Sequence, residues 1–119
     1  MKPAFRAIGL LLLVALPACR SAGPIREARE QARMGARAAR FHLYAEAYFR
    51  FQKAAALAPA DARYLNNLAV LAETQGRFDE AGTLYKKALA LDPKNKKIKF
   101  NDDKLQAYLK PPPSKPPAP

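Results

Sequence analysis

The chain matches itself when it is shifted by 34 residues. Small residues fall on small residues, as with Gly35 on Ala69 and Ala47 on Ala81. The further matched pairs are Met34 with Leu68, Ala38 with Ala72, Tyr44 with Phe78, Phe51 with Tyr85, Ala54 with Ala88, Leu57 with Leu91 and Pro59 with Pro93. A fixed period of this length indicates a repeat architecture, in which each unit buries its apolar face against the next.

The two copies resemble tetratricopeptide repeats, and the resemblance covers about Ala28 to Asn95. The second copy carries the fuller set of matching residues: Leu68-Ala69, Gly76, Phe78-Asp79-Glu80-Ala81, Tyr85, Ala88 and Leu91-Asp92-Pro93. The resemblance implies an all-α fold, a short α-solenoid with two helix-turn-helix repeats at about 28–61 and 62–95. A C-terminal capping helix at about 96–109 would complete a domain of residues 26–110.

Local signals place the helix boundaries within this frame. Helices are expected near 26–40, 44–57, 62–75, 79–91 and 96–109. Pro59 and Pro93 end the second helix of each pair, because proline disfavours helical geometry in the residue before it. Gly76, and His42 at the equivalent place, suit tight turns between paired helices. The other signals are N-caps at Asp61 and Asn95, a helix-spaced set of Ile98, Leu105, Tyr108 and Leu109, and Gly82, which has no evident reason beyond close packing.

The N-terminal residues have the pattern of an export signal. A basic start precedes an apolar run over residues 7–16, which is too short to span a bilayer. The sequence Leu16-Pro17-Ala18-Cys19 resembles the lipobox of bacterial lipoproteins. This resemblance implies cleavage of residues 1–18, acylation of Cys19, and an anchor and tether over residues 19–25. Ordinary signal peptidase cleavage is the alternative, although it requires a small residue where Leu16 stands.

The same resemblance predicts where the protein resides. A lipid-anchored chain would lie in the bacterial cell envelope. Arg20, and not Asp, follows the cysteine, and under the enterobacterial sorting rule this permits transfer to the outer membrane, facing the periplasm. Other bacteria sort differently, so the inner membrane stays open. A single cysteine also agrees with acylation, because it cannot form an internal disulfide.

Residues suited to catalysis are scarce. His42 is the only histidine, and Ser21 and Ser114 are the only serines and lie in the tails. Asp102 and Asp103 are adjacent, so on a helix they point apart. No glycine-rich phosphate loop or metal-ligand spacing is present in the sequence. We therefore expect no enzyme, catalytic residue, metal or cofactor, with His42 as a turn residue in preference to a ligand.

Positive charge dominates the chain, which has a net charge of +11. Five arginines form one stripe of the first helix: Arg26, Arg29, Arg33, Arg37 and Arg40. The stripe fits a solvated face, a face against anionic lipid or a groove for an acidic partner. By resemblance, the first helix of each pair lines a concave groove, which predicts these partner-binding residues: Arg29, Arg33, Arg40, Arg63, Asn67, Lys97 and Asn101, with Ala36 and either Leu71 or Val70. In the family an Asn at the position of Asn67 often holds a peptide backbone.

These features predict an envelope adaptor or assembly factor, lipid-anchored and binding another protein or peptide, with no nucleic acid as partner. The alternative is a structural basic lipoprotein on anionic lipid or cell-wall polymer, without a specific protein partner. A regulatory partner of an envelope enzyme would differ only in what is bound. Since repeat proteins usually need three units, the domain would be marginal alone or complete itself as a homodimer. The Pro-rich tail over residues 111–119 is either a simple end segment or a spacer or ligand.

Overall fold

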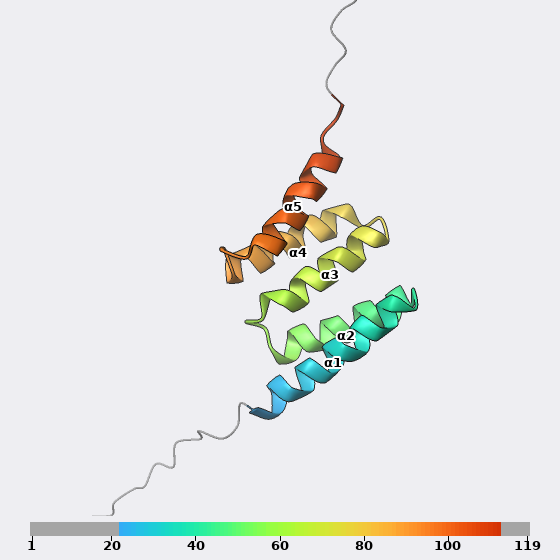
Figure 1. The fold of residues 1–119 in the computed structure, drawn as a ribbon, viewed down its shortest axis with the longest axis vertical. Coiled ribbons are helices and arrows are strands. Elements are labelled where there is room, and N and C mark those ends of the chain that lie inside the picture. The colour runs from blue at the N-terminus through green and yellow to red at the C-terminus, as the bar shows by residue number, and fades with distance from the viewer. Residues whose placement is uncertain (1–21, 113–119) are drawn as a thin grey trace, which may run out of the picture.

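The computed structural model describes residues 22–112, and this part of the chain is all-α (Figure 1). Its helices are α1 (Ala22–Arg40), α2 (Tyr44–Leu57), α3 (Ala62–Thr74), α4 (Phe78–Leu91) and α5 (Lys96–Leu109). Cys19, the leader and residues 113–119 of the tail lie outside the described residues. No helix between Ala22 and Pro112 has the length and apolar character that crossing a bilayer requires.

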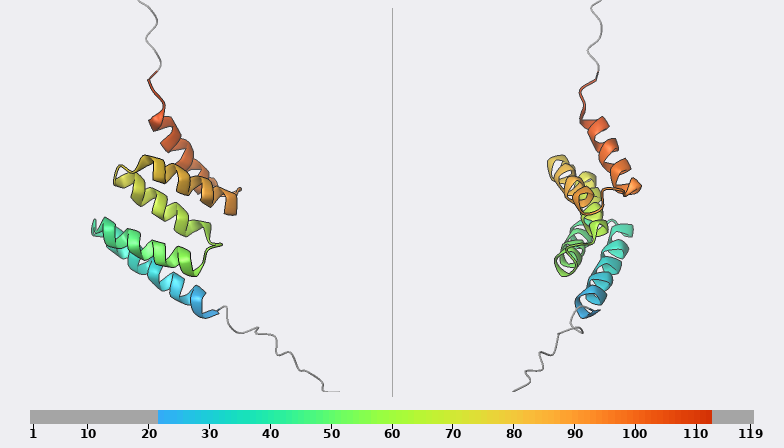
Figure 2. Two further views of the ribbon diagram at one scale, coloured as in Figure 1. Left: turned by 180° about the vertical axis from the view of Figure 1, so that it is seen from behind. Right: turned by 90° about the vertical axis from the view of Figure 1, so that its left-hand side faces the viewer.

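The helices form two hairpins and a final single helix (Figures 1 and 2). α1 packs on α2, and α3 packs on α4; α2 then contacts α3, and α4 contacts α5. α1, α3 and α5 lie toward one side of the stack, while α2 and α4 lie toward the other (Figure 2, right). This arrangement confirms the expected fold of two helical hairpins followed by a capping helix.

The first helix starts earlier than the sequence predicted, at Ala22 in place of residue 26. Pro24 lies in its first turn, where a proline is tolerated because the first amide groups have no partner within the helix. In the sequence, Arg20 and Ser21 are the residues between Cys19 and Ala22.

The turns within the two hairpins, α1–α2 and α3–α4, have the same backbone hydrogen bonds. At the end of α1, Leu43 N donates to Ala38 O and His42 N donates to Ala39 O, each at 3.0 Å. The end of α3 repeats the pattern, with Gly76 in the place of His42. The φ angles of His42 and Gly76 are 59° and 75°, so both adopt left-handed geometry. The predicted turn role of these two positions is confirmed.

The predicted N-caps are also present. The Asp61 side chain accepts from Arg63 N, and the Asn95 side chain accepts from Ile98 N. Each cap satisfies an amide that the first helical turn leaves unpaired. Asp61 thus ends the loop between the two hairpins, and Asn95 ends the loop before α5.

Apolar side chains form two connected clusters. Phe51, Tyr64 and Leu71 contribute to the first cluster, between the two hairpins, while Tyr85 and Ile98 contribute to the second, under α5. Small residues sit at the helix crossings, and four of them are fully buried or nearly so: Gly35, Ala47, Ala69 and Ala81. Tyr44 and Phe78, also expected to fill the space between layers, are only half-buried.

The outer face of α5 is polar where the equivalent face of α3 is apolar. A shift of 34 residues relates α5 to α3, so each position of α5 can be compared with its equivalent in α3. Leu65, Leu68, Ala69 and Ala72 of α3 correspond to Lys99, Asp102, Asp103 and Gln106 of α5. These polar residues bond to one another, as in the 3.0 Å ion pair of Lys99 with Asp103. α5 therefore presents a solvated face where a further helix would need an apolar one.

Candidate functional site

The surface formed by α1, α3 and α5, called the concave face below, is the candidate binding surface (Figure 2). Between α3 and α5 it contains a hollow of about 320 Å³. Its lining comes from α3, from α5 and from the start of α4: Val70, Glu73, Thr74, Phe78, Asn101, Lys104 and Tyr108. Val70, Phe78 and Tyr108 supply the apolar part of this lining, whereas Asn101 and Lys104 are bonded to Asn66 and Glu73.

The predicted arginine stripe lies along the exposed side of α1. Buried Ala28, Gly35 and Ala38 occupy the opposite side of that helix. Within residues 22–112, only Arg33 of the five arginines forms an ion pair, 2.7 Å from Glu30. Both partners are well exposed, so this pair contributes little to stability. The stripe is thus an accessible basic surface with guanidinium groups available to an anionic partner.

Two predicted binding residues already have partners inside the chain. Arg63 bonds to its own N-cap Asp61 through two contacts, Nε to Oδ1 at 2.9 Å and Nη2 to Oδ2 at 2.6 Å. The hydrogen bond from Arg63 holds the pKa of Asp61 below its ordinary value. Asn101 Nδ2 donates to Asn66 Oδ1 at 3.0 Å, which ties α5 to α3. A partner that used either residue would have to compete with these contacts.

The remaining predicted positions differ in accessibility. Lys97 is exposed and Asn67 is half-buried. Of the two alternatives in α3, Val70 is the surface residue, because Leu71 is buried in the first apolar cluster. Leu71 points toward the preceding hairpin, whereas Val70 opens onto the hollow.

The aromatic residues of the hollow were not predicted as a site. The rings of Phe78 and Tyr108 lie 5.3 Å apart. Phe78 begins α4, whereas Tyr108 lies near the end of α5. Tyr108 was expected to share the apolar spacing of Ile98 and Leu105, yet it is 71% exposed. No described helix covers this side of α5. A shift of 34 residues places Tyr108 over Thr74 of α3, and this register could have indicated the concave face.

A polar chain runs beneath the hollow. Tyr85 OH donates to Glu73 Oε2 at 3.0 Å, and Lys104 Nζ lies 3.5 Å from Glu73 Oε1. Burial and the nearby Glu73 carboxylate raise the pKa of the Tyr85 phenol, so it stays protonated and donating at neutral pH. The link joins α3, α4 and α5, and thereby holds the wall of the hollow in place.

The histidine and the adjacent aspartates of the sequence form hydrogen bonds within the fold. His42 Nδ1 lies 2.7 Å from Tyr44 OH in the turn between α1 and α2. Among residues 22–112, no three His, Cys, Asp or Glu side chains cluster in a way that could hold a metal ion. Asp102 and Asp103 bond separately, to Gln106 and Lys99.

Comparison with known proteins supports the repeat assignment for the second hairpin. Residues 62–95 match the family described as tetratricopeptide repeat. α3 and α4 form this repeat. Among solved structures, the chain is similar to the Arabidopsis OM64 TPR domain, with 19% identity and a TM-score of 0.40 over 73% of this chain and 100% of that chain. No curated protein matches the chain.

Proposed function

We propose that this protein is a lipid-anchored adaptor of the bacterial cell envelope, which binds another protein or peptide on its concave face. Stacked helical repeats generally present extended concave surfaces for protein partners. The observation that carries the proposal is the accessible arginine stripe of α1, which adjoins a surface with a separate apolar hollow. An acidic partner that also carries an aromatic or aliphatic side chain fits both features.

The charge pattern favours a carboxylate-bearing partner. Arg29 and Arg40 are exposed on α1. Arg33 forms an ion pair with Glu30, and both side chains are exposed. Guanidinium groups match the planar geometry of carboxylates and bind them through two hydrogen bonds. The apolar hollow at Val70 and Tyr108 would then accept one side chain of the same partner.

The lipid anchor is the second part of the proposal and depends on Cys19. The lipobox resemblance supports diacylglycerol on the Cys19 thiol after removal of residues 1–18. Export into the envelope follows from the same signal. Mass spectrometry of the mature N-terminus tests this part directly: an acylated Cys19 supports it, and an unacylated start at any other residue rules it out.

A triple charge reversal tests the adaptor. Arg29, Arg33 and Arg40 are replaced together with Glu, and crosslinked partners are compared in native membranes by mass spectrometry. The matched control places the same change on α2 and α4, at the exposed residues Lys53, Lys86 and Lys87. The adaptor predicts that one defined partner disappears with the groove variant and persists with the control.

The alternative is a basic lipoprotein that coats anionic lipid or cell-wall polymer without a specific protein partner. It predicts that both triple variants lose sedimentation with liposomes or cell wall to a similar degree, because it depends on charge alone. If sedimentation falls and no crosslinked protein changes, the adaptor proposal is wrong. Which envelope protein is bound, including an enzyme under regulation, follows from the identity of the crosslinked species.

A further inference from the structure

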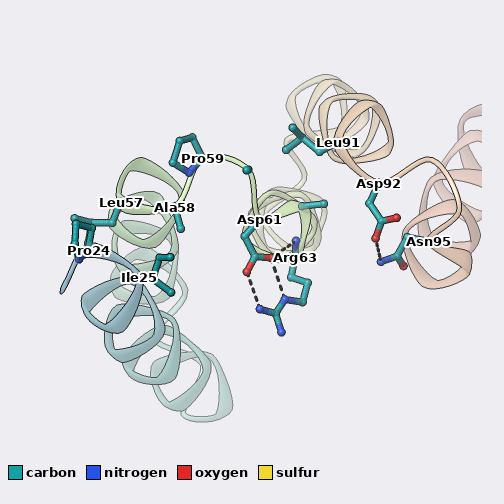
Figure 3. Close-up of a pocket in the computed structure, with 12 residues that line it drawn as sticks. Pro24, Ile25, Leu57, Ala58, Pro59, Asp61, Arg63, Leu91, Asp92 and Asn95 are labelled. Atoms are coloured by element: carbon teal, nitrogen blue, oxygen red, sulfur yellow. Dashed lines mark hydrogen bonds and ion pairs between the residues drawn. The ribbon is translucent and has the colours of Figure 1, made fainter. Parts of the chain in front are cut away.

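An apolar hollow of about 780 Å³ lies along the edge of the helix stack where α1 and α3 begin and where α2 and α4 end (Figure 3). Three segments meet there: Pro24 and Ile25 at the start of α1, the loop 57–60 between α2 and α3, and Leu91 at the end of α4. Ile25 and Leu91 are each 44% exposed. This loop-end face, as it is called below, adjoins the concave face at Arg63, and no described helix covers its apolar side chains.

Several basic residues are next in sequence to the residues that line the loop-end face. Arg26 follows Ile25, and three exposed lysines flank the loop before α5: Lys94, Lys96 and Lys97. The two acidic residues of the hollow are occupied within the chain. Asp61 pairs with Arg63, and Asp92 Oδ2 accepts from Asn95 Nδ2 at 2.9 Å (Figure 3). An apolar centre with a basic rim is the pattern of a surface that enters the interface of an anionic bilayer.

The position of the proposed anchor selects this end of the molecule. Only Arg20 and Ser21 separate Cys19 from Ala22, so an extended tether spans at most about 11 Å. Pro24 and Ile25 lie in the first turn of α1, whereas the far end of this helix lies about 23 Å farther along its axis. Exposed apolar residues at that far end, such as Phe41 and Leu43, are therefore beyond the direct reach of the tether.

We propose that the loop-end face docks on an anionic lipid bilayer, with Ile25, Leu91 and the loop 57–60 in the interface. The basic rim contacts lipid phosphates. Docking turns the axis of α1 away from the membrane and leaves the concave face open to a partner in the aqueous space. The inference rests on the proposed anchor at Cys19 for the proximity of the bilayer. The apolar and basic residues of the face are present whether or not Cys19 is acylated.

An environment-sensitive fluorophore tests the docked orientation. The full chain is produced in a bacterial host, and the mature protein is placed in vesicles of phosphatidylcholine with phosphatidylglycerol. Ala60→Cys carries the fluorophore on the loop-end face, and Gln75→Cys carries it at the other end of α3. Docking predicts a blue shift, and quenching by spin-labelled lipid, at position 60 and not at position 75. Equal water exposure of both labels in the acylated protein overturns the inference.

Substitutions on the face itself separate its apolar and basic contributions. Ile25→Ser with Leu91→Ser abolishes the shift at position 60, while Phe41→Ser with Leu43→Ser leaves it unchanged. Replacing Lys94, Lys96 and Lys97 with Glu lowers the ratio of docked to undocked protein by at least about fivefold per residue. The control change of Lys53, Lys86 and Lys87 to Glu has a smaller effect. An equal effect of the two lysine triads contradicts a defined docking face.

The outcomes for the anchor and for the face are distinguishable. Mass spectrometry of the same sample reports acylation of Cys19. If Cys19 is not acylated, the anchor proposal fails, and the fluorescence of the Ala60→Cys variant in a Cys19→Ser background is measured with added vesicles. A shift on anionic vesicles then still supports the face, and its absence on both anionic and neutral vesicles overturns it.

Discussion

The ring of Phe51 lies directly against the backbone of Gly35. A β-carbon on Gly35 would come within 3.0 Å of Cδ2 and Cε2 of that ring, and within 3.2 Å of the Ala47 carbonyl oxygen. Phe51 is buried, so its ring has little room to move away. α1 and α2 therefore cross so closely that a β-carbon at position 35 would crowd the Phe51 ring.

We expect Gly35→Ala to lower the free energy of unfolding. Alanine is the better helix former by about 1 kcal/mol, but overpacking against a buried ring costs about 1–3 kcal/mol. Urea denaturation followed by circular dichroism measures the difference. In a Phe51→Leu background the penalty should shrink, because the smaller side chain leaves space for the methyl group. A more stable Gly35→Ala protein would contradict the close crossing.

Gly82→Ala should have the opposite sign. Gly82 is buried in α4, yet the nearest atoms to an added β-carbon are 3.7 Å away on Gln106 and 3.9 Å away on Leu105. These are ordinary contact distances, so the close packing expected from the sequence does not demand glycine here. The substitution should raise the free energy of unfolding by up to about 1 kcal/mol, measured by the same denaturation. A loss of stability would show that the α4–α5 contact is tighter than these distances.

The two turn residues predict a reciprocal pair of variants. His42 and Gly76 have the same left-handed backbone geometry, which costs a non-glycine residue about 1 kcal/mol or more. His42→Gly should therefore raise the midpoint of thermal unfolding, reduced slightly by loss of the exposed contact with Tyr44. Gly76→Ala should lower it by a comparable amount. Scanning calorimetry of both variants provides the check, and shifts of the same sign would be inconsistent with the shared turn.

Asp61 predicts a dependence of stability on pH. The hydrogen bond from Arg63 lowers the pKa of this carboxyl in the folded protein, so folding is favoured by its ionised form. The stabilisation is fully present above the ordinary pKa of about 4 and is lost as the pH falls through the lower folded value. Asp61→Ala should cost about 1 kcal/mol at pH 7 and less at pH 3.

Asn95→Ala is the matched control for that experiment, because Asn95 caps α5 with a side chain that does not titrate. Its cost should come mainly from the lost cap and vary less with pH. Parallel pH dependence of the Asp61→Ala and Asn95→Ala penalties would argue against the ion pair with Arg63 as the cause.

The bond between Asn66 and Asn101 predicts coupling between α3 and α5. Asn66 is 4% exposed and accepts from Asn101 at 3.0 Å. Asn101→Ala leaves that buried amide oxygen without this donor, which should cost about 1–3 kcal/mol. The double variant Asn66→Ala, Asn101→Ala should cost less than the sum of the single variants. Strict additivity in urea denaturation would mean that the two amides act independently.

Helix positions and turn geometry followed closely from the sequence because their causes are local. Pro59 and Pro93 restrict the residue before them, and Asp61 and Asn95 cap amides within three residues. The boundary that differed most, the start of α1, depended on Pro24, which helices accept in the first turn but not later.

The surface contacts depend on residues far apart in sequence and could not be predicted from neighbours. Asn66 and Asn101 are 35 positions apart, and Phe78 meets Tyr108 only after α5 folds back across the hairpin. The accessible arginine stripe was evident from spacing alone, whereas the pairing of Arg63 with Asp61 required the actual side-chain conformations.

The 34-residue period, through its resemblance to tetratricopeptide repeats, predicted that this chain builds stacked helical hairpins. Small residues recur where two helices cross, and bulky residues recur between the helix layers. Composition and spacing likewise identified the basic surface of α1. Only the packed helices revealed that Val70 rather than Leu71 reaches the surface, that Tyr108 stays exposed and that an apolar hollow opens beside the start of α1. Each of these features depends on which helix covers which face. Contacts between helices far apart in the sequence decide this, and the 34-residue period does not specify them.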